Sequence, residues 1–324
     1  MKIAITGGAG LIGSHISEQL LREGHEITII DNLSRGKFEN VSPLINTYNG
    51  KIKFINDDLV DYAAAKKNLV GIDSVFHLAA IVGGVKLAET SRSAIIPTID
   101  CNVARACVEN DVAHVLYTST ACAYPVSTQT SSCVGVKMTE TMMEMPAEPE
   151  NLYGWAKLYG ELMFKKFHEI HGLGLTIVRD FNVYGPKEDN DPVMSHVIPM
   201  LIRRALEKSN VPLTVWGSGN QYRSFMYADD AAQGMIGAFK QIKDGSPVNL
   251  GSEEAITIRE LAKTILVACN RRPDDIVFDR DQPEGVFWRC PDTTRARTLL
   301  NWKPETSLEE GINRAVAYYR THPQ

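Results

Sequence analysis

The most informative segment of this 324-residue chain for its architecture is Lys2-Ile3-Ala4-Ile5-Thr6-Gly7-Gly8-Ala9-Gly10-Leu11-Ile12-Gly13. Its first five residues predict a buried strand, and the glycine-rich run after them leads into a helix. Gly7 allows a tight turn, Gly10 lets the backbone approach a pyrophosphate, and Gly13 lets helix and strand pack closely. We therefore expect a dinucleotide cofactor to contact this segment, through Gly7, Gly10, Leu11, Ile12 and Gly13.

The next apolar run, Glu26-Ile27-Thr28-Ile29-Ile30, predicts a second strand that ends at Asp31. An acidic side chain about 20 residues after the glycine turn accepts hydrogen bonds from the adenosine ribose and would repel a 2′-phosphate. Asp31 therefore favours NAD over NADP, although an Asp that only ends a strand is the alternative.

A second centre is predicted at Leu152-Tyr153-Gly154-Trp155-Ala156-Lys157. On a helix, Tyr153 and Lys157 share one face because they are four residues apart. An ammonium group stabilises a phenolate, so the pair can supply a base for a hydroxyl proton, as reversible oxidation of an alcohol requires. The same spacing also occurs without function on amphipathic helices. Here a buried strand ending in Thr118-Ser119-Thr120 lies about thirty residues earlier and adds a hydroxyl to the set.

Strands and helices alternate from the first residue to about residue 180, with further strands expected near 52–56, 74–77, 114–118 and 175–179. Such alternation predicts an α/β fold with a doubly wound parallel sheet of the Rossmann type.

Composition restricts the class of protein further. A net charge near −5 and a pI near 5.9 give no general attraction to nucleic acid or membrane. The six cysteines lack the spacing of metal ligands, so we expect reduced thiols, no metal site and a cytoplasmic location. We recognise no signal peptide and no apolar run long enough to span a membrane.

In combination, these motifs resemble those of the extended short-chain dehydrogenase/reductase family, specifically its nucleotide-sugar epimerases and dehydratases. The resemblance covers nearly the whole chain and rests on the glycine turn, Asp31, Asp58-Leu59, His77-Leu78-Ala79-Ala80, Thr120, Tyr153, Lys157 and Asn182-Val183-Tyr184-Gly185-Pro186. It implies a tightly held NAD that Asn32, Asp58 and Leu59 also contact. It further implies that Tyr153 takes the proton of the sugar C4 hydroxyl while Thr120 bonds the same oxygen.

The resemblance also implies an interleaved architecture. Residues 1–181 and 225–254 would form the NAD-binding Rossmann domain, and residues 182–224 and 255–324 a smaller α/β domain for the nucleotide sugar. Helices near 93–110 and 152–171 resemble those that pair two subunits in a four-helix bundle, so we expect a homodimer.

The reaction that follows oxidation depends on the residues beside the sugar. Family 4,6-dehydratases carry an Asp-Glu pair after the catalytic threonine, whereas this chain has Ala121 and Cys122. Ala121-Cys122-Ala123-Tyr124-Pro125 is similar to the segment of GDP-mannose 3,5-epimerases and GDP-fucose synthases whose cysteine is an acid or base. Ser195-His196-Val197-Ile198-Pro199 resembles the run with the partner histidine of the synthases, where the 3,5-epimerases use lysine. We therefore expect Cys122 and His196 to exchange protons with the sugar, although inert packing and a solvated histidine are the alternatives.

Further resemblances imply contacts with the substrate. Gly83 and Gly84 would lie against the sugar, and Asn182 would lie near it. Arg223 and Arg289 would bind the diphosphate, because a guanidinium group can donate two hydrogen bonds to phosphate oxygens.

These expectations combine into an NAD-dependent epimerase that acts through a transient 4-keto sugar, inverting C5, or C3 and C5, of a GDP-hexose without net redox change. Simple 4-epimerisation, of the UDP-glucose 4-epimerase type, stays open with Cys122 idle. Asp31 argues against an NADPH-dependent 4-keto reductase, and Thr120 with Tyr153 and Lys157 argues against a non-catalytic NAD-binding regulator. The sequence selects neither the base, which is guanine, uracil or thymine, nor the hexose.

Overall fold

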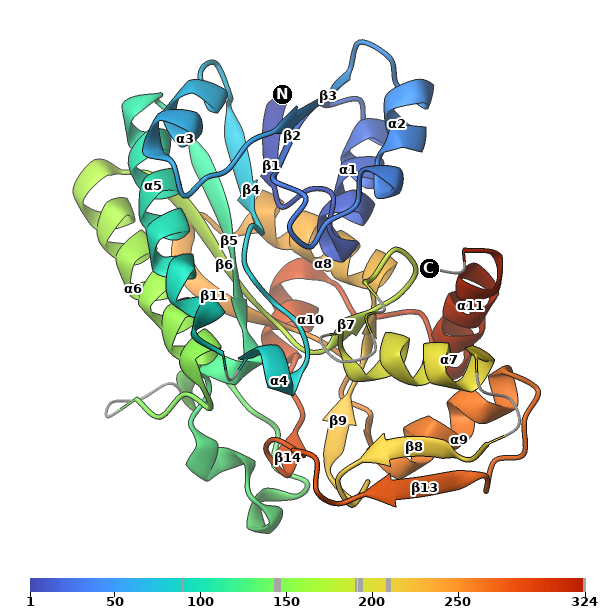
Figure 1. Ribbon diagram of the computed structural model, residues 1–324. Coiled ribbons are helices and arrows are strands. Elements are labelled where there is room, and N and C mark those ends of the chain that lie inside the picture. Colours follow the sequence, from blue (N-terminus) through green and yellow to red (C-terminus); the bar gives the residue numbers. More distant parts are fainter. Residues whose placement is uncertain (89, 143–146, 190, 192–194, 208–210, 323–324) are drawn as a thin grey trace.

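The computed structural model describes residues 1–88, 90–142, 147–189, 191, 195–207 and 211–322. Its centre is a parallel sheet of seven strands in the order β11-β6-β5-β4-β1-β2-β3 (Figure 1). The strands are β1 (Lys2–Thr6), β2 (Glu26–Asp31), β3 (Ile52–Asn56), β4 (Ser74–His77), β5 (His114–Thr120), β6 (Gly174–Asp180) and β11 (Asp244–Leu250). The doubly wound parallel sheet expected from the sequence is confirmed, with the bounds of its first six strands within two residues.

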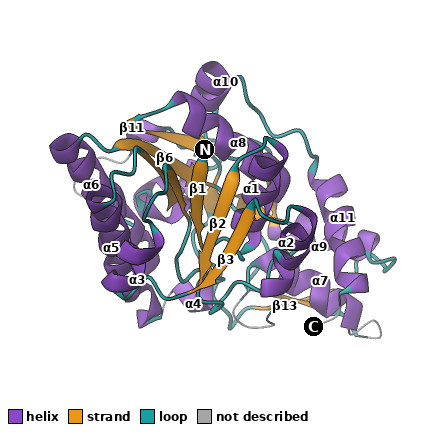
Figure 2. Cartoon of the chain, turned by 90° about the horizontal axis from the view of Figure 1, so that it is seen from above, coloured by secondary structure: helices purple, strands orange, loops and turns teal. Residues whose placement is uncertain are grey.

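Helices cover both faces of this sheet (Figure 2). One face carries α3 (Tyr62–Asn68), α5 (Ile96–Glu109) and α6 (Leu152–His171), and the other carries α1 (Leu11–Arg22), α8 (Ala228–Gln241) and α10 (Thr294–Leu300). Each face has its own apolar core, because strands buried on both sides present apolar side chains to both. Shorter elements are α2 (Ser42–Thr47), which packs on β3, α4 (Val85–Ala88), and the 3-10 turns at Phe38–Asn40, Ser91–Ile95, Ala121–Ala123, Val126–Gln129, Ser131–Cys133 and Glu140–Met142.

After β6 the chain leaves the sheet and later returns to it. On the return, β10 (Met226–Tyr227) pairs with β7 (Val183–Tyr184), α8 packs on α1, and β11 joins β6. The other late elements form a second body with its own apolar core, at the lower right of Figure 1. They are α7 (Val197–Glu207), β8 (Leu213–Trp216), β9 (Tyr222–Ser224), β12 (Ala255–Thr257), α9 (Ile258–Ala268), β13 (Ile276–Asp279), β14 (Trp288–Arg289) and α11 (Leu308–Thr321). The division into two interleaved domains stays a proposal, which the pairing of β11 supports.

Two glycines let α6 lie directly against β5 and the turn after it. A Cβ at Gly160 would lie 1.9 Å from the Tyr117 hydroxyl oxygen, and one at Gly154 would lie 2.2 Å from the carbonyl oxygen of Cys122. Tyr117 is fully buried, and its hydroxyl donates to Asp100 Oδ2 at 2.8 Å, so it has little freedom to move away. The helix face with Tyr153 and Lys157 is thereby held at the end of β5.

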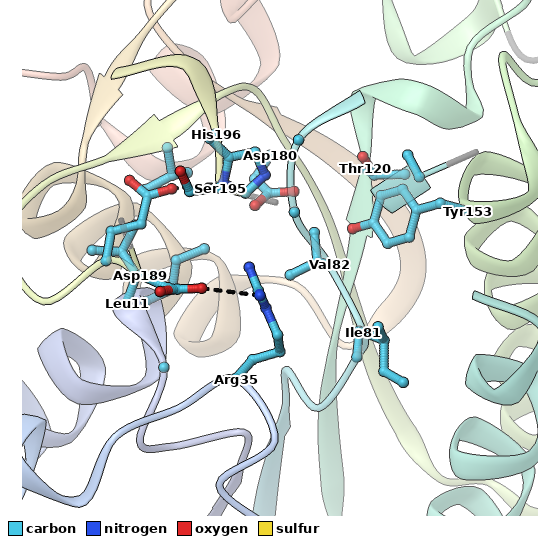
Figure 3. A pocket seen from close by; sticks show the side chains of 18 of the residues that line it. Leu11, Arg35, Ile81, Val82, Thr120, Tyr153, Asp180, Asp189, Ser195 and His196 are labelled. Atoms are coloured by element: carbon cyan, nitrogen blue, oxygen red, sulfur yellow. Dashed lines mark hydrogen bonds and ion pairs between the residues drawn. The ribbon is translucent and has the colours of Figure 1, made fainter. Parts of the chain in front are cut away.

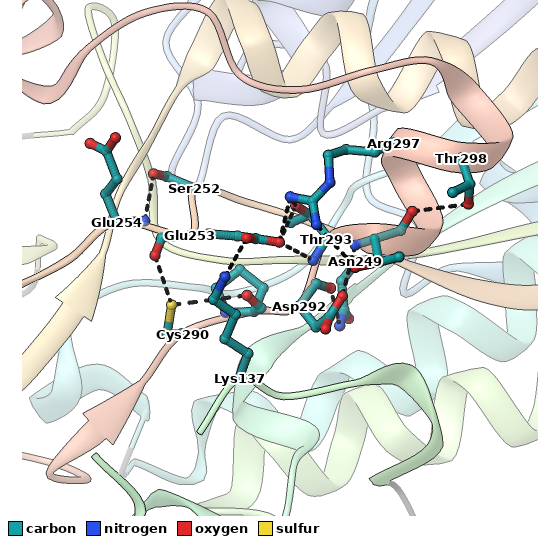
Figure 4. Close-up of polar contacts among 12 residues, drawn as sticks. Lys137, Asn249, Ser252, Glu253, Glu254, Cys290, Asp292, Thr293, Arg297 and Thr298 are labelled. Carbon is teal, nitrogen blue, oxygen red and sulfur yellow. Dashed lines mark hydrogen bonds and ion pairs between the residues drawn. The ribbon is translucent and has the colours of Figure 1, made fainter. Parts of the chain in front are cut away.

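A network around Glu253 joins three segments that are distant in sequence (Figure 4). Its carboxylate pairs with Lys137, accepts from Thr293 N at 2.8 Å, and accepts from Arg297 Nη1 at 2.7 Å. Burial alone would raise the pKa of Glu253, but the hydrogen bonds from Lys137 and Thr293 lower it to about 2. The network anchors the segment that follows β14, and therefore helps to position Arg289 at the end of that strand.

The structure also bears on cysteine chemistry and membrane insertion. All six cysteines are free thiols. Within the described ranges, no helix combines the length and the apolar character needed to cross a bilayer. The expected cytoplasmic location stays a prediction.

We expect Gly160→Ala to lower the free energy of unfolding by about 1–3 kcal/mol, because the added methyl group overpacks the contact between α6 and Tyr117. Urea unfolding followed by circular dichroism, at one fixed NAD concentration, measures this effect. Gly237→Ala in α8 is the matched control, because its Cβ meets no atom within 4 Å. Helix propensity should make that control more stable by up to about 1 kcal/mol. Equal stability of the two variants would contradict the close packing described above.

Candidate active site

A cavity of about 550 Å³ lies along the carboxyl edge of the sheet (Figure 3). All site residues expected from the sequence line it: Gly7, Gly10, Leu11, Ile12, Gly13, Asp31, Asn32, Asp58, Leu59, Gly83, Gly84, Thr120, Cys122, Tyr153, Lys157, Asn182, His196, Arg223 and Arg289. They meet because the carboxyl ends of parallel strands share one edge, where ligands of such sheets bind. Their individual roles stay predictions.

The glycine turn leaves no room for side chains at the start of α1. Gly7 adopts a positive φ of 70°, and a Cβ there would lie 2.9 Å from Ala79 N. A Cβ at Gly13 would lie 2.6 Å from the carbonyl oxygen of Gly7. Gly10 is the N-cap of α1 and brings no capping side chain, so the free N–H groups of the first turn can receive a pyrophosphate. The turn fits a dinucleotide.

Polar groups at the ends of β2 and β3 complete the nucleotide end of the cavity. Asp31 Oδ2 accepts from Ala9 N at 3.0 Å, and its Oδ1 accepts from Leu33 N at 2.8 Å. Burial raises the pKa of Asp31, and these two hydrogen bonds partly offset the rise. Asn32 Nδ2 donates to Asp58 Oδ2 at 3.2 Å. The carboxylate of Asp31 is thus oriented by backbone donors and still lines the cavity, which suits an adenosine ribose.

Arg35 is a cavity residue that the sequence analysis missed. Its Nη1 lies 2.9 Å from Asp189 Oδ2, and this ion pair joins the segment after β2 to the segment after β7 (Figure 3). Sequence spacing contains no signal for it, since the partners are far apart along the chain.

Thr120, Tyr153 and Lys157 meet at the end of β5. The side chains of Thr120 and Tyr153 lie near each other at the cavity (Figure 3), and the Thr120 hydroxyl acts to lower the pKa of the phenol. Lys157 is buried, and its Nζ lies 4.7 Å from the centre of the Tyr117 ring. Burial, followed by the charge of Asp180, raises the pKa of Tyr153 well above 10. The lower phenol pKa that Lys157 was expected to produce is therefore not found in the protein alone, because burial penalises the phenolate.

Cys122 lies beside this group and contacts a guanidinium. Its backbone N donates to Thr120 Oγ1 at 3.2 Å, and Arg289 Nη1 lies 3.4 Å from its Sγ. Burial raises the pKa of the Cys122 thiol, and Arg289 lowers it by less. The thiol is therefore neutral near pH 7, at the cavity wall.

Glu150, which the sequence analysis did not select, pairs with Arg289 and acts electrostatically on Arg223. Arg289 Nη2 lies 2.5 Å from Glu150 Oε2, while its Nε donates to Gln129 Oε1 at 2.8 Å. Burial would raise the pKa of Glu150, but Arg289 lowers it to about 2. Burial, and then the like charge of Arg289, lower the pKa of Arg223 to about 10. The charge of Glu284 also acts on Arg223, so two guanidinium groups and two carboxylates meet at this end of the cavity, with the guanidinium of Arg289 against Cys122. A cation in contact with the thiol favours an anionic ligand group there.

His196 is oriented by a second carboxylate that the sequence analysis missed. Its Nδ1 lies 2.6 Å from Glu188 Oε1, and the Glu188 side chain is 7% exposed whereas that of His196 is 44% exposed. Burial alone would lower the pKa of His196, but the hydrogen bond and charge of Glu188 outweigh it and raise the pKa. A buried carboxylate behind an accessible imidazole is an arrangement that strengthens histidine as a base.

Asn182, expected near the sugar, also has a structural contact. It adopts a positive φ of 43°, and its Nδ2 donates to the carbonyl oxygen of Ser224 at 2.8 Å. This bond joins the end of β6 to β9. Gly83 and Gly84 precede α4 at the same cavity.

Comparison with known proteins identifies the family. A family model described as the NAD dependent epimerase/dehydratase family matches residues 3–251, and the chain belongs to this family. The chain is 32% identical to a UDP-N-acetyl-alpha-D-glucosaminuronate decarboxylase of Bacillus cytotoxicus, over 98% of this chain and 97% of the relative. It is 31% identical to GDP-mannose 3,5-epimerase 1 of Oryza sativa subsp. japonica, over 96% of this chain and 80% of the relative.

A solved structure supports the same assignment. The UDP-glucuronic acid 4-epimerase of Bacillus cereus, in complex with UDP-glucuronic acid and NAD, matches with a TM-score of 0.85 and 28% identity, over 99% of this chain and 100% of that chain. The expected fold class and the expected cofactor, NAD, are thereby confirmed. The relatives act on different nucleotide sugars, so the comparisons define the family and leave the individual reaction open.

We expect Glu188→Gln to lower the pKa of His196, because the substitution removes the carboxylate that stabilises the imidazolium. With that carboxylate absent, burial dominates and His196 should become neutral at a lower pH. Histidine ring signals recorded by NMR against pH measure the change, expected to exceed one pH unit. His114, which bonds Thr176 and whose pKa is lowered to about 4 chiefly by burial, is the internal reference and should keep its titration. An unchanged His196 titration would show that Glu188 does not control it.

Proposed function

We propose that the protein is an NAD-dependent nucleotide-diphosphate-sugar epimerase that works through a transient 4-keto sugar and inverts C5, or C3 and C5, of a GDP-hexose. The main support is the position of Cys122, whose sulfur contacts Arg289 at the wall of the cavity that Thr120, Tyr153 and His196 also line. Simple 4-epimerisation needs neither a thiol nor a histidine at this place.

In the proposed first step, Tyr153 accepts the proton of the C4 hydroxyl while Thr120 holds the same oxygen. NAD, when bound by the glycine turn and Asp31, supplies the acceptor for the hydride from C4. Tyr153 acts as a base only as a phenolate, which burial and the charge of Asp180 disfavour in the protein alone. In the proposal, the ammonium of Lys157, four residues along the same helix face, supplies the compensating charge when the ligands are bound.

In the proposed second step, the 4-keto group acidifies the C–H bonds at C3 and C5. The His196–Glu188 pair suits removal of the proton, because Glu188 stabilises the imidazolium that forms. The neutral thiol of Cys122 suits delivery of a proton to the opposite face. Return of the hydride to C4 then completes a reaction without net redox change.

A nucleotide hexuronate is a second candidate substrate, with decarboxylation as the reaction. Arg289, although paired with Glu150, also contacts Cys122, so a guanidinium lies beside the residue that is proposed to act on the sugar. A 4-keto hexuronate is a β-keto acid that can lose carbon dioxide. Decarboxylases of uronic acid sugars occur among the relatives at 30–32% identity, which supports testing this reaction.

Solvent deuterium distinguishes these reactions. With GDP-mannose in D₂O, we expect product deuterated at C5, or at C3 and C5, by NMR. Cys122→Ser should reduce the formation of the inverted, deuterated product at least about 100-fold, because it removes the proton donor on the opposite face. Tyr153→Phe should abolish both the incorporation and the transient absorbance of NADH, because it removes the base for C4 oxidation.

Other products would overturn the proposal. An unlabelled product inverted at C4, from GDP- or UDP-hexoses, would identify a 4-epimerase. Release of carbon dioxide from a UDP-hexuronate, with a labelled pentose, would identify a decarboxylase. Tyr153→Phe with unchanged turnover would exclude this active site altogether.

We further propose a homodimer through α5 and α6. Trp155, Tyr159 and Leu162 on α6 are 48%, 52% and 54% exposed, and their spacing puts them on one helix face. This apolar stripe faces away from the cavity that Tyr153 and Lys157 line. A stripe of three large side chains is suited to pack against a second copy of the same helix.

Leu162→Glu should convert the proposed dimer into a monomer, because it places a charge in the apolar interface. Light scattering coupled to size-exclusion chromatography measures the mass. Leu299→Glu is the control, because Leu299 in α10 is 50% exposed on the other side of the sheet. A wild-type monomer, or a dimer that survives Leu162→Glu, would contradict this interface.

A further inference from the structure

Asp180 is an acidic residue of the cavity that the mechanism above does not use. It is the last residue of β6, and in the sheet its Cα is the register partner of Thr120 in β5. Side chains at matched positions of neighbouring strands project from the same face of a sheet. Asp180 therefore lines the cavity together with Thr120 and Tyr153, and Figure 3 shows it beside His196.

The carboxylate of Asp180 has charged neighbours and no tight partner. Lys157 and His196 both act on it electrostatically, and its own charge acts on Tyr153. No side chain in the described part of the chain hydrogen-bonds to it or forms an ion pair with it. Burial raises the pKa of Asp180 to about 6, against the lowering effect of Lys157. An unpaired acid in a cavity wall is available to a ligand.

The nicotinamide ring must approach Tyr153 and Thr120, because the hydride leaves the same sugar carbon whose hydroxyl these residues hold. That requirement brings the ring to the wall that Asp180 shares. The oxidised ring carries a positive charge and the reduced ring carries none, so a carboxylate stabilises only the oxidised form. We propose that Asp180 biases the bound cofactor towards NAD⁺ over NADH.

In an enzyme without net redox change, this bias would favour the return of the hydride from the cofactor to the sugar. A site that disfavours NADH makes the bound NADH a stronger hydride donor, so the hydride returns to the 4-keto sugar instead of remaining on the cofactor. The value of the bias to the reaction rests on the proposed function. The bias itself concerns NAD alone, and its test requires no sugar.

The test compares the two cofactor forms on the full chain. The protein is equilibrated with mixtures of NAD⁺ and NADH, freed of unbound nucleotide, and analysed for the ratio retained. For Asp180→Asn, which keeps the shape and removes the charge, we expect the preference for NAD⁺ over NADH to fall about tenfold. Asp189→Asn is the matched control, because Asp189 lines the same cavity and pairs with Arg35. Its preference should stay as in the wild type.

If Asp180→Asn changes the retention of NAD⁺ and of NADH equally, the proposal is overturned and Asp180 is only a counter-ion of Lys157.

A measurement against pH keeps the proposal testable if that variant does not fold. His196 also acts on Asp180 electrostatically and is itself titratable, so the measurement uses His196→Gln. Burial raises the pKa of Tyr153, which therefore keeps its proton, and Lys157 is the charged neighbour of Asp180 that remains.

With His196→Gln, the preference for NAD⁺ should fall as the pH is lowered from 8 to 5.5, because Asp180 gains a proton as the pH falls through about 6. A preference that is constant over this range would overturn the proposal. Where Asp180→Asn folds, the double variant should show the constant value.

Discussion

The direct contact between α6 and the end of β5 is the constraint on which the site depends. Gly154 and Gly160 have no Cβ, so the helix backbone reaches the carbonyl oxygen of Cys122 and the ring of Tyr117. This contact sets the distance between the helix face with Tyr153 and the strand end with Thr120, two segments about thirty residues apart in sequence. Hydrogen bonds weaken within a few tenths of an ångström, so even a methyl group between helix and strand would separate the groups that we propose act in catalysis.

Burial then determines the charge of each group in the cavity. Lys157 is enclosed with the carboxylates of Asp100 and Asp180, and Arg289 with that of Glu150. In a poorly hydrated site such charges persist only beside partners of opposite sign. For Cys122, burial outweighs the opposing charge of Arg289, and for Tyr153 the charge of Asp180 adds to the effect of burial, so the pKa values of both groups rise. The thiol and the phenol therefore stay protonated until a charged ligand changes the balance, which is consistent with chemistry that starts only after the cofactor and the sugar are enclosed.

Family membership accounts for the part of the site that binds NAD and oxidises an alcohol, and the remaining residues distinguish one reaction from another. Ala121 and Cys122 stand where dehydratases of the resembled type carry two acids. Arg289 contacts the thiol, and Glu188 orients His196. These contacts support the proposal of an acid and a base at one cavity. The positive charge of Arg289 near Cys122 is the reason to test a hexuronate as an alternative substrate.

The sequence by itself determined the glycine turn, the first six strands and the Tyr153–Lys157 pair, because backbone conformation, periodicity and helical spacing are local properties. It could not reveal Glu150, Asp180 or Glu188, whose importance comes from neighbours reached only through sheet register or loop packing. Tertiary structure alone decided that Arg289 meets Cys122, which is 167 residues away. It also decided that the Tyr153 pKa rises, because burial depends on everything packed around the phenol and on no single neighbour in the chain.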